Sequence, residues 1–174
     1  MRTTTILKDE HRYISRALDV IERMAARREN GESLDSREVG DILRFLRLFA
    51  DNHHQGKEEM ILFPALLKDR NQIHYTALAQ FIFAHNQERS EIVGLENAIE
   101  ESQDVTFVPY AKRLLEVLRA HIEEENHRLF ELTDATLTPQ EDMEVARELA
   151  GFERHWQDTV LTGLLARLSQ IEDA

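Results

Sequence analysis

The chain has 174 residues, of which 42% are hydrophobic and 31% charged, so it is long enough to bury one core and we expect a single domain. Only 6 glycines and 3 prolines occur, so turn-forming residues are scarce and the composition favours an all-α fold. The formal net charge of −12 argues against nucleic-acid binding, which needs clustered lysine and arginine.

The absence of cysteine excludes disulfides, thiolate nucleophiles, iron–sulfur clusters and cysteine-based zinc sites. A transition metal would therefore have to be bound by histidine and carboxylate side chains. The N-terminal MRTTTILKDEH has no apolar signal region, and no apolar run approaches the length of a membrane span. We expect a cytoplasmic protein with no membrane partner.

The first helix is expected to begin at Thr3 to Thr5, which can cap it, and to end near Asn30-Gly31. Its apolar stripe includes one histidine, and the stripe consists of Leu7, His11, Ile14, Leu18 and Ile21.

The second helix is expected to begin with the capping-box pair Asp35 and Glu38 and to bend or end near Pro64. At about 100° per residue it has two apolar faces. One face holds Leu43, Ala50, His54, Glu58, Ile61 and Ala65, and the other holds Phe45, Phe49, Met60 and Phe63. The second face would need cover from a later helix or from a partner chain, so a homodimer is possible.

The third helix is predicted from about Tyr75 to Ser102, after the polar break KDRNQ, with Leu78, Ile82, His85 and Ile92 on one stripe. Pro109 is predicted to begin the fourth helix, whose stripe is Leu114, Leu118, His121, Glu125, Leu129 and Leu132. A capping box from Thr138 to Glu141 opens a fifth helix that reaches nearly to Ala174. We therefore predict an up-down four-helix bundle over residues 1–135 with an additional C-terminal helix over residues 136–174.

Two helices carry the same unusual spacing of metal-ligand side chains. His54 and Glu58 lie four residues apart within HHQGKEEMILFP, so they project from one helix face, and His121 and Glu125 repeat the spacing. The first and third helices each add one histidine on the apolar stripe, His11 and His85. Four imidazoles and two carboxylates converging in a dry core would suit a pair of divalent ions bridged by the carboxylates.

These residues resemble the hemerythrin-like, or HHE cation-binding, proteins. The resemblance covers roughly Leu7 to Leu132 and is strongest in HHQGKEEMILFPAL and LRAHIEEENHRLFEL, which look like the two H-x-x-x-E helices of that family. It implies an up-down four-helix bundle with two iron ions in an oxo- or hydroxo-bridged di-iron centre. The implied metal ligands are His11, His54, Glu58, His85, His121 and Glu125.

One position departs from the oxygen-carrying hemerythrins, which place a second histidine one turn after the third-helix ligand. Here the residue four positions after His85 is Arg89, as in many bacterial relatives. One iron is therefore expected to keep a position open to water or substrate, which favours reactivity over reversible oxygen carriage.

The other polar residues near the motifs have structural interpretations. His53 is expected to pack or to support a ligand, and His74, His127 and His155 are expected to be solvated or structural. Glu59 either supports a ligand histidine or forms a salt bridge, and Glu123 and Glu124 belong to a solvated face.

The leading functional hypothesis is a non-haem di-iron protein that binds or reacts with dioxygen, peroxide or nitric oxide at the open iron position. No catalytic acid or base is evident beyond the ligands, so turnover is left open. The alternative is a sensing or iron-storage module without turnover. A ferritin-like centre is a weaker alternative, because that class uses Glu-x-x-His spacing, and zinc or manganese could replace iron.

Overall fold

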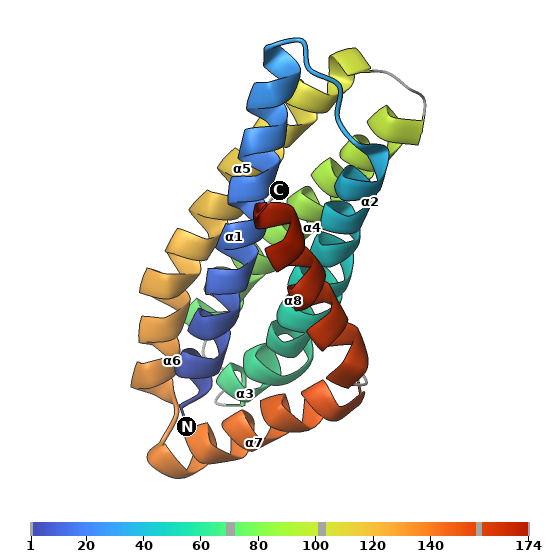
Figure 1. Cartoon of the computed structure of the whole chain (residues 1–174). Helices are drawn as coiled ribbons and strands as arrows, with labels where there is room; N and C mark the ends of the chain where they lie inside the picture. The colour runs from blue at the N-terminus through green and yellow to red at the C-terminus, as the bar shows by residue number, and fades with distance from the viewer. Residues whose placement is uncertain (1, 69–71, 101–103, 156–157, 174) are drawn as a thin grey trace.

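The computed structural model describes residues 2–68, 72–100, 104–155 and 158–173, and these residues form helices and connecting turns without any strand. The described helices form four long runs and two further helices near the C-terminus. The long runs lie side by side (Figure 1). The first run is α1 (Thr3–Glu29), and the third is α4 (Gln72–Glu100). The second run joins α2 (Ser36–Phe45), η1 (Leu46–Gln55), η2 (Glu58–Leu62) and α3 (Phe63–Leu66). The fourth joins α5 (Asp104–Glu124), η3 (Glu125–Leu129) and α6 (Phe130–Thr136).

The C-terminal region contains two helices where the sequence predicted one. Helix α7 (Pro139–His155) crosses one end of the long runs and packs on α1 and η2, whereas α8 (Asp158–Glu172) leans against α1 and α2 (Figure 1). A single straight helix could not follow both surfaces. The predicted capping box is confirmed, because the Thr138 amide donates to Glu141 Oε2 at 2.9 Å and the Glu141 amide donates to Thr138 Oγ1 at 3.3 Å.

One predicted cap and one predicted helix start are wrong. Helix α1 begins at Thr3, within the predicted range, but its first turn is capped from another helix, because the amide of Thr3 donates to Asp142 Oδ1 of α7 at 3.0 Å and the threonines do not cap it themselves. Helix α5 begins at Asp104, so Pro109 lies inside it. Pro109 lies in the second turn of α5, where its missing N–H costs the helix one intrahelical hydrogen bond near its N-terminal end.

Some predicted boundaries lie outside the described residues. These are the break at residues 69–71, the end of the third helix at Ser102 and the end of the chain at Ala174. The second run ends at Leu66, two residues after Pro64, as the proline predicted.

The predicted second apolar face of the second run is covered by the C-terminal helices. Phe45 and Phe49 are buried in the same apolar cluster as Leu164 and Leu168 of α8. Met60 is the exception, with 69% of its surface exposed. The sequence analysis named a later helix or a partner chain as the cover for this face. In the structure the C-terminal helices cover it.

The core consists of two apolar clusters with a polar layer between them. Along α1, Leu7 belongs to one cluster and Ile14 to the other, with His11 between them. Along the fourth run, Leu118 and Leu129 bracket His121 and Glu125 in the same way. Each large side chain buried in these clusters stabilises the fold by roughly 1.5–3 kcal/mol, so the clusters can offset the cost of the polar layer. None of the described helices combines the length and apolar character needed to cross a bilayer.

Candidate metal centre

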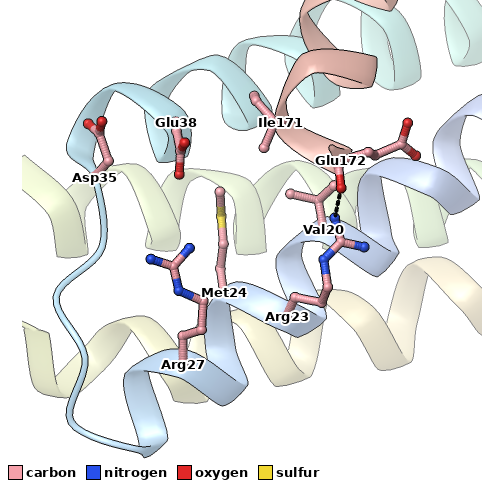
Figure 2. A pocket seen from close by; sticks show the side chains of 8 residues that line it. All are labelled: Val20, Arg23, Met24, Arg27, Asp35, Glu38, Ile171 and Glu172. Atoms are coloured by element: carbon pink, nitrogen blue, oxygen red, sulfur yellow. Dashed lines mark hydrogen bonds between the residues drawn. The ribbon is translucent and has the colours of Figure 1, made fainter. Parts of the chain in front are cut away.

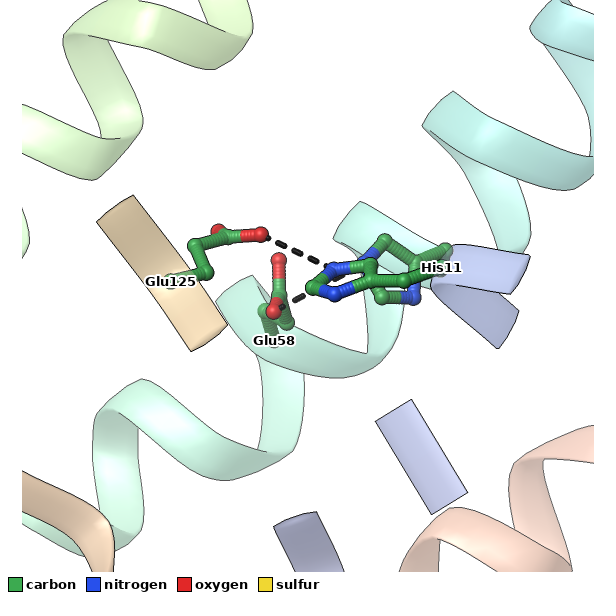
Figure 3. Close-up of side chains that lie close together, drawn as sticks. His11, Glu58 and Glu125 are labelled. Atoms are coloured by element: carbon green, nitrogen blue, oxygen red, sulfur yellow. Dashed lines mark hydrogen bonds and ion pairs between the residues drawn. The ribbon is translucent and has the colours of Figure 1, made fainter. Parts of the chain in front are cut away.

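The polar layer brings together all six side chains predicted to bind metal, and each of the four long runs contributes to it. All are buried, with exposed fractions of at most 6%, and they are His11, His54, Glu58, His85, His121 and Glu125. In Figure 3 the side chains of His11, Glu58 and Glu125 point toward one another from three different runs. The tertiary fold thus makes one cluster from residues that are up to 114 positions apart in the chain.

Both H-x-x-x-E motifs coincide with π-helical turns. The π-helical segment η1 contains His54, and η2 and η3 begin at Glu58 and Glu125. A π-turn hydrogen bonds from residue i to i+5 and widens the helix, and such turns are frequent at functional sites. Three of the four motif residues, His54, Glu58 and Glu125, therefore lie in widened turns, whereas His121 lies in the α-helix α5.

One group of four donors lies between α1, the second run and the fourth run. His11 Nε2 is 2.9 Å from His54 Nε2 and 3.1 Å from Glu125 Oε2. His54 Nε2 is 3.8 Å from Glu58 Oε1. Two imidazole nitrogens at 2.9 Å require a proton between them, and a cation could replace that proton.

A second group of four lies between the second run, α4 and the fourth run. His85 Nε2 is 3.4 Å from Glu58 Oε2 and 3.6 Å from Glu125 Oε1, and His121 Nε2 is 2.9 Å from Glu125 Oε1. In each of the two groups the donor atoms all lie within 4.8 Å of one another. Glu58 and Glu125 belong to both groups, with one oxygen toward each, which is the arrangement of carboxylates that bridge two cations.

Several donor atoms at this point are buried without a hydrogen bond from any described residue. They are both carboxylate oxygens of Glu58, one oxygen of Glu125, and the Nε2 atoms of His85 and His121. His121 Nε2 and Glu125 Oε1 lie 2.9 Å apart as an ion pair, but without the alignment of a hydrogen bond. Buried polar atoms are normally satisfied, and leaving them unsatisfied is costly. The donor set of imidazole nitrogens and carboxylate oxygens fits divalent transition metals, and cations would satisfy all of these atoms at once.

The charges of the cluster are strongly coupled when no cation is present. Burial alone would lower the pKa of His85, but the carboxylates of Glu125, Glu58 and Glu59 outweigh it and raise this pKa to about 12. Burial alone would raise the pKa of Glu125, but His121 and His11 hold it well below its ordinary value. The protons held on the imidazoles therefore stand in for the positive charge that cations would bring.

Three side chains orient the candidate ligand histidines from behind. Glu10 accepts a hydrogen bond from His54 Nδ1 at 2.8 Å, and Glu59 accepts one from His85 Nδ1 at 2.6 Å. Asn126 Oδ1 lies 3.1 Å from His11 Nδ1. Donation from Nδ1 leaves Nε2 as the nitrogen that faces the centre, as is usual for metal-binding histidines. Glu59 thus has both of its expected roles, because it also pairs with Arg89 at 2.8 Å.

A buried ion cluster behind His54 was missed by the sequence analysis. Glu10 pairs with Lys57, whose side chain is fully buried, and lies 3.4 Å from His53 Nε2. Burial opposes ionisation of Glu10, but hydrogen bonds from His53 and His54 hold its pKa well below the ordinary value. His53 therefore supports His54 indirectly, because it contacts Glu10 and Glu10 contacts His54.

Glu88 and Gln55 are further buried polar residues that the sequence analysis missed. The inward stripe of α4 runs through Phe81, His85, Glu88 and Ile92, whereas Ile82, predicted for this stripe, is 41% exposed. Phe81 takes the inward place because it packs on the His121 ring at 6.0 Å. A glutamate at this spacing on an apolar stripe is the signal that could have identified Glu88.

Arg89 lies to one side of the centre and pairs with Asp51 at 2.7 Å and with Glu59.

Among the other histidines, His74 Nδ1 hydrogen bonds the Leu66 carbonyl oxygen at 3.1 Å and His127 is exposed, as expected. The side chain of His155 lies outside the described part of the structure. Glu123 and Glu124 are exposed, in agreement with a solvated face.

Two surface pockets differ in their relation to the centre. One of about 340 Å³ lies between α4 and the fourth run, and its lining includes Phe81 and His121. The other, of about 440 Å³, lies between α1, α2 and α8 (Figure 2). Its charged lining, which includes Arg23, Arg27 and Glu38, contains none of the candidate ligands. Only the first of these two pockets has a candidate metal ligand in its lining.

The fold and the site define a class, that of all-helical proteins with buried histidine and carboxylate clusters able to hold metal cations. The pattern of the family described as hemerythrin HHE cation binding domain matches residues 2–133, so the chain belongs to this family. Comparisons with curated proteins and with solved structures gave no match.

Proposed function

We propose that the protein binds two iron ions in this centre and that a small ligand, dioxygen, peroxide or nitric oxide, binds or reacts at an iron position that the protein leaves open. The observation that supports this function best is the sharing of Glu58 and Glu125, each with one oxygen toward each histidine pair. Residues 1–135 would form an up-down four-helix bundle around the ions, with residues 136–174 as its C-terminal cover, in one domain.

The donor set supports iron without selecting it over zinc or manganese, since imidazole and carboxylate ligands bind all three. Bound iron would supply redox and Lewis-acid chemistry toward the small ligand. The protein would hold the metal-coordinating nitrogen and oxygen atoms in place, and its two apolar clusters would exclude water from the centre. The pocket beside His121 offers a route from the surface to the centre.

A sensing or storage role without turnover is the second candidate, and the position of α7 favours it. Gly56 lies between His54 and Glu58 in the sequence, and a Cβ added to it would lie 3.3 Å from the Phe152 ring of α7. Helix α7 therefore packs closely on the segment that carries these two candidate ligands. Phe152 also lies 6.2 Å from the His53 ring, measured between centroids. A change in metal occupancy could thus be transmitted to α7.

The test is elemental analysis and visible spectroscopy of the wild type and of a His54→Ala/His121→Ala double variant. We expect about two irons per chain and an oxo-bridge absorption band, both lost in the double variant. His127→Ala is the matched control, because His127 is exposed on η3 and should keep both ions. Wild-type protein that takes up no iron on anaerobic reconstitution would overturn the proposal.

The two candidate functions are separated by turnover assays on the iron-loaded protein. Catalytic loss of peroxide or nitric oxide supports the reactive centre. A stoichiometric spectral change without turnover supports the sensing or storage role.

A further inference from the structure

Glu88 is a carboxylate that the six expected ligands leave unexplained. It lies on α4 one turn after His85, and only 1% of its surface is exposed. Its neighbour Arg89 points to Asp51 and Glu59 at the edge of the bundle. Glu88, rather than the residue four positions after His85, therefore follows the inward face of α4.

The two oxygens of Glu88 have different surroundings. Oε2 accepts a hydrogen bond from the side-chain amide of Gln55, itself 3% exposed, whereas Oε1 is buried without a hydrogen bond from any described residue. Oε1 lies 3.8 Å from His121 Nε2, whose own close contact is the 2.9 Å ion pair with Glu125 Oε1, without the alignment of a hydrogen bond. Both unsatisfied atoms belong to the His85–His121 side of the centre.

Glu10 shows what a carboxylate buried for structural reasons looks like in this protein. It is similarly buried, but its oxygens contact His53, His54 and Lys57. The one ion pair of Glu88 among the described residues is the 3.8 Å contact with the candidate ligand His121, and burial outweighs the attraction of His121 and His85 and raises the pKa of Glu88 to about 7. A structural carboxylate of that kind is costly, whereas a ligand has a partner once a cation is present.

We propose that Glu88 is a further ligand of the metal ion held by His85 and His121, and that Gln55 is its positioning residue. This inference rests on the proposed function, because it assigns a residue to one of the two ions. Two divalent ions would bring four positive charges, of which Glu58 and Glu125 cancel two, and Glu88 cancels a third inside a layer with little solvent.

Glu88 makes the two ion positions unequal. It is not among the four donors that lie within 4.8 Å of one another, so its side chain would have to move toward the centre to bind the cation. The His85–His121 ion would then have five protein donor groups and the His11–His54 ion four. The position left open for the small ligand would accordingly be on the His11–His54 ion, although the surface pocket has His121 in its lining.

The test compares full-length wild type with Glu88→Gln and Gln55→Ala, using anaerobic ferrous iron and, as a redox-silent probe, zinc. Glu91→Gln is the matched control, because Glu91 lies on the same helix and pairs with Arg113 at 3.1 Å. Affinities come from calorimetric titration, the two iron environments from Mössbauer spectra of iron-57-loaded protein, and stability from thermal unfolding of metal-free protein.

We expect Glu88→Gln to weaken the binding of one of the two ions by at least about 10-fold and to alter one of the two Mössbauer environments. Gln55→Ala should weaken the binding of the same ion to a smaller extent. Metal-free Glu88→Gln should be at least as stable as the metal-free wild type, because the substitution removes a buried carboxylate with few partners.

Two results would overturn the assignment of Glu88 alone. One is a Glu88→Gln variant that binds both ions with wild-type affinities and spectra. The other is an equal loss at both ions together with a less stable metal-free protein, which would show a structural role. If the wild type binds neither iron nor zinc, the proposed function fails and the assignment fails with it.

Discussion

The two histidine pairs share the same two carboxylates, but they are held in different ways. His54 is oriented by Glu10, which is 6% exposed and pairs with the fully buried Lys57. His85 is oriented by Glu59, whose side chain is 29% exposed and which also pairs with Arg89. One pair is thus anchored from the interior and the other from near the surface. A repeated motif in the sequence has become an asymmetric site in the structure.

Removal of a shared carboxylate should abolish the difference between the two sides. Glu125→Gln leaves one neutral amide oxygen where the carboxylate has one oxygen beside His11 and the other beside His121 and His85, so the side chain can no longer bridge and both ions should bind more weakly by over about 100-fold. The measurement is metal content after dialysis against a weak chelator. Glu123→Gln, an exposed change in the same acidic run, should keep both ions. Retention of one ion in Glu125→Gln would contradict the bridging role.

Removal of one histidine should separate the two sides. We expect His11→Ala to lose the ion of its own group and His85→Ala to lose the other, so metal content falls from about two ions per chain to about one in each variant. Elemental analysis gives the count, and Mössbauer spectra show which environment remains. Loss of both ions from either variant would show that the centre binds them as one cooperative unit.

The orienting carboxylates should have unequal effects. Glu10→Gln should weaken metal binding by about 10–100-fold and should also lower stability, because the buried ammonium of Lys57 loses an ionic contact. Glu59→Gln should weaken metal binding by about 10-fold with little change in stability, since Glu59 is partly exposed. Chelator titrations and thermal unfolding measure the two effects, and equal stability losses would argue against an interior anchor at His54.

The smallest expected effect is a pH dependence that changes sign with metal. In the metal-free protein the pKa values of His11, His85 and His121 are raised above 6.5, mainly by the carboxylates that outweigh burial. The protonated histidines therefore stabilise the folded state fully below pH 6.5, and this stabilisation is lost as the pH rises through their pKa values in the folded protein. The pKa of Glu88 is raised from 4.5 to about 7, so this residue also makes the folded protein less stable as the pH rises between these two values.

Metal-free protein should therefore unfold at a lower temperature at about pH 8 than at about pH 6. Iron-loaded protein should show the reverse, because metal binds deprotonated histidines and releases their protons. Thermal unfolding of chelator-treated and iron-loaded samples at the two pH values measures both slopes. Equal slopes with and without metal would indicate that the imidazole protons and the cations do not compete.

Local patterns in the chain carried much of the fold. The scarcity of glycine and proline and the apolar periodicity predicted an all-helical protein, and the structure is helical throughout the described residues apart from turns. The repeated H-x-x-x-E spacing and the single histidines His11 and His85 pointed to one buried cluster. These features depend on neighbours within about one helical turn, and such contacts can be read directly from a sequence.

The surroundings of the cluster were decided by contacts between helices. Glu10 meets His54 and Lys57 across 44 and 47 residues of chain, and Gln55 meets Glu88 across 33. The cap of α1 comes from Asp142, and the C-terminal cover turns into two helices because it follows two surfaces. The π-helical turns likewise shift residues away from their positions on an ideal helix. Helical periodicity says which residues face inward, but only the packing of the helices decides which of those inward residues meet.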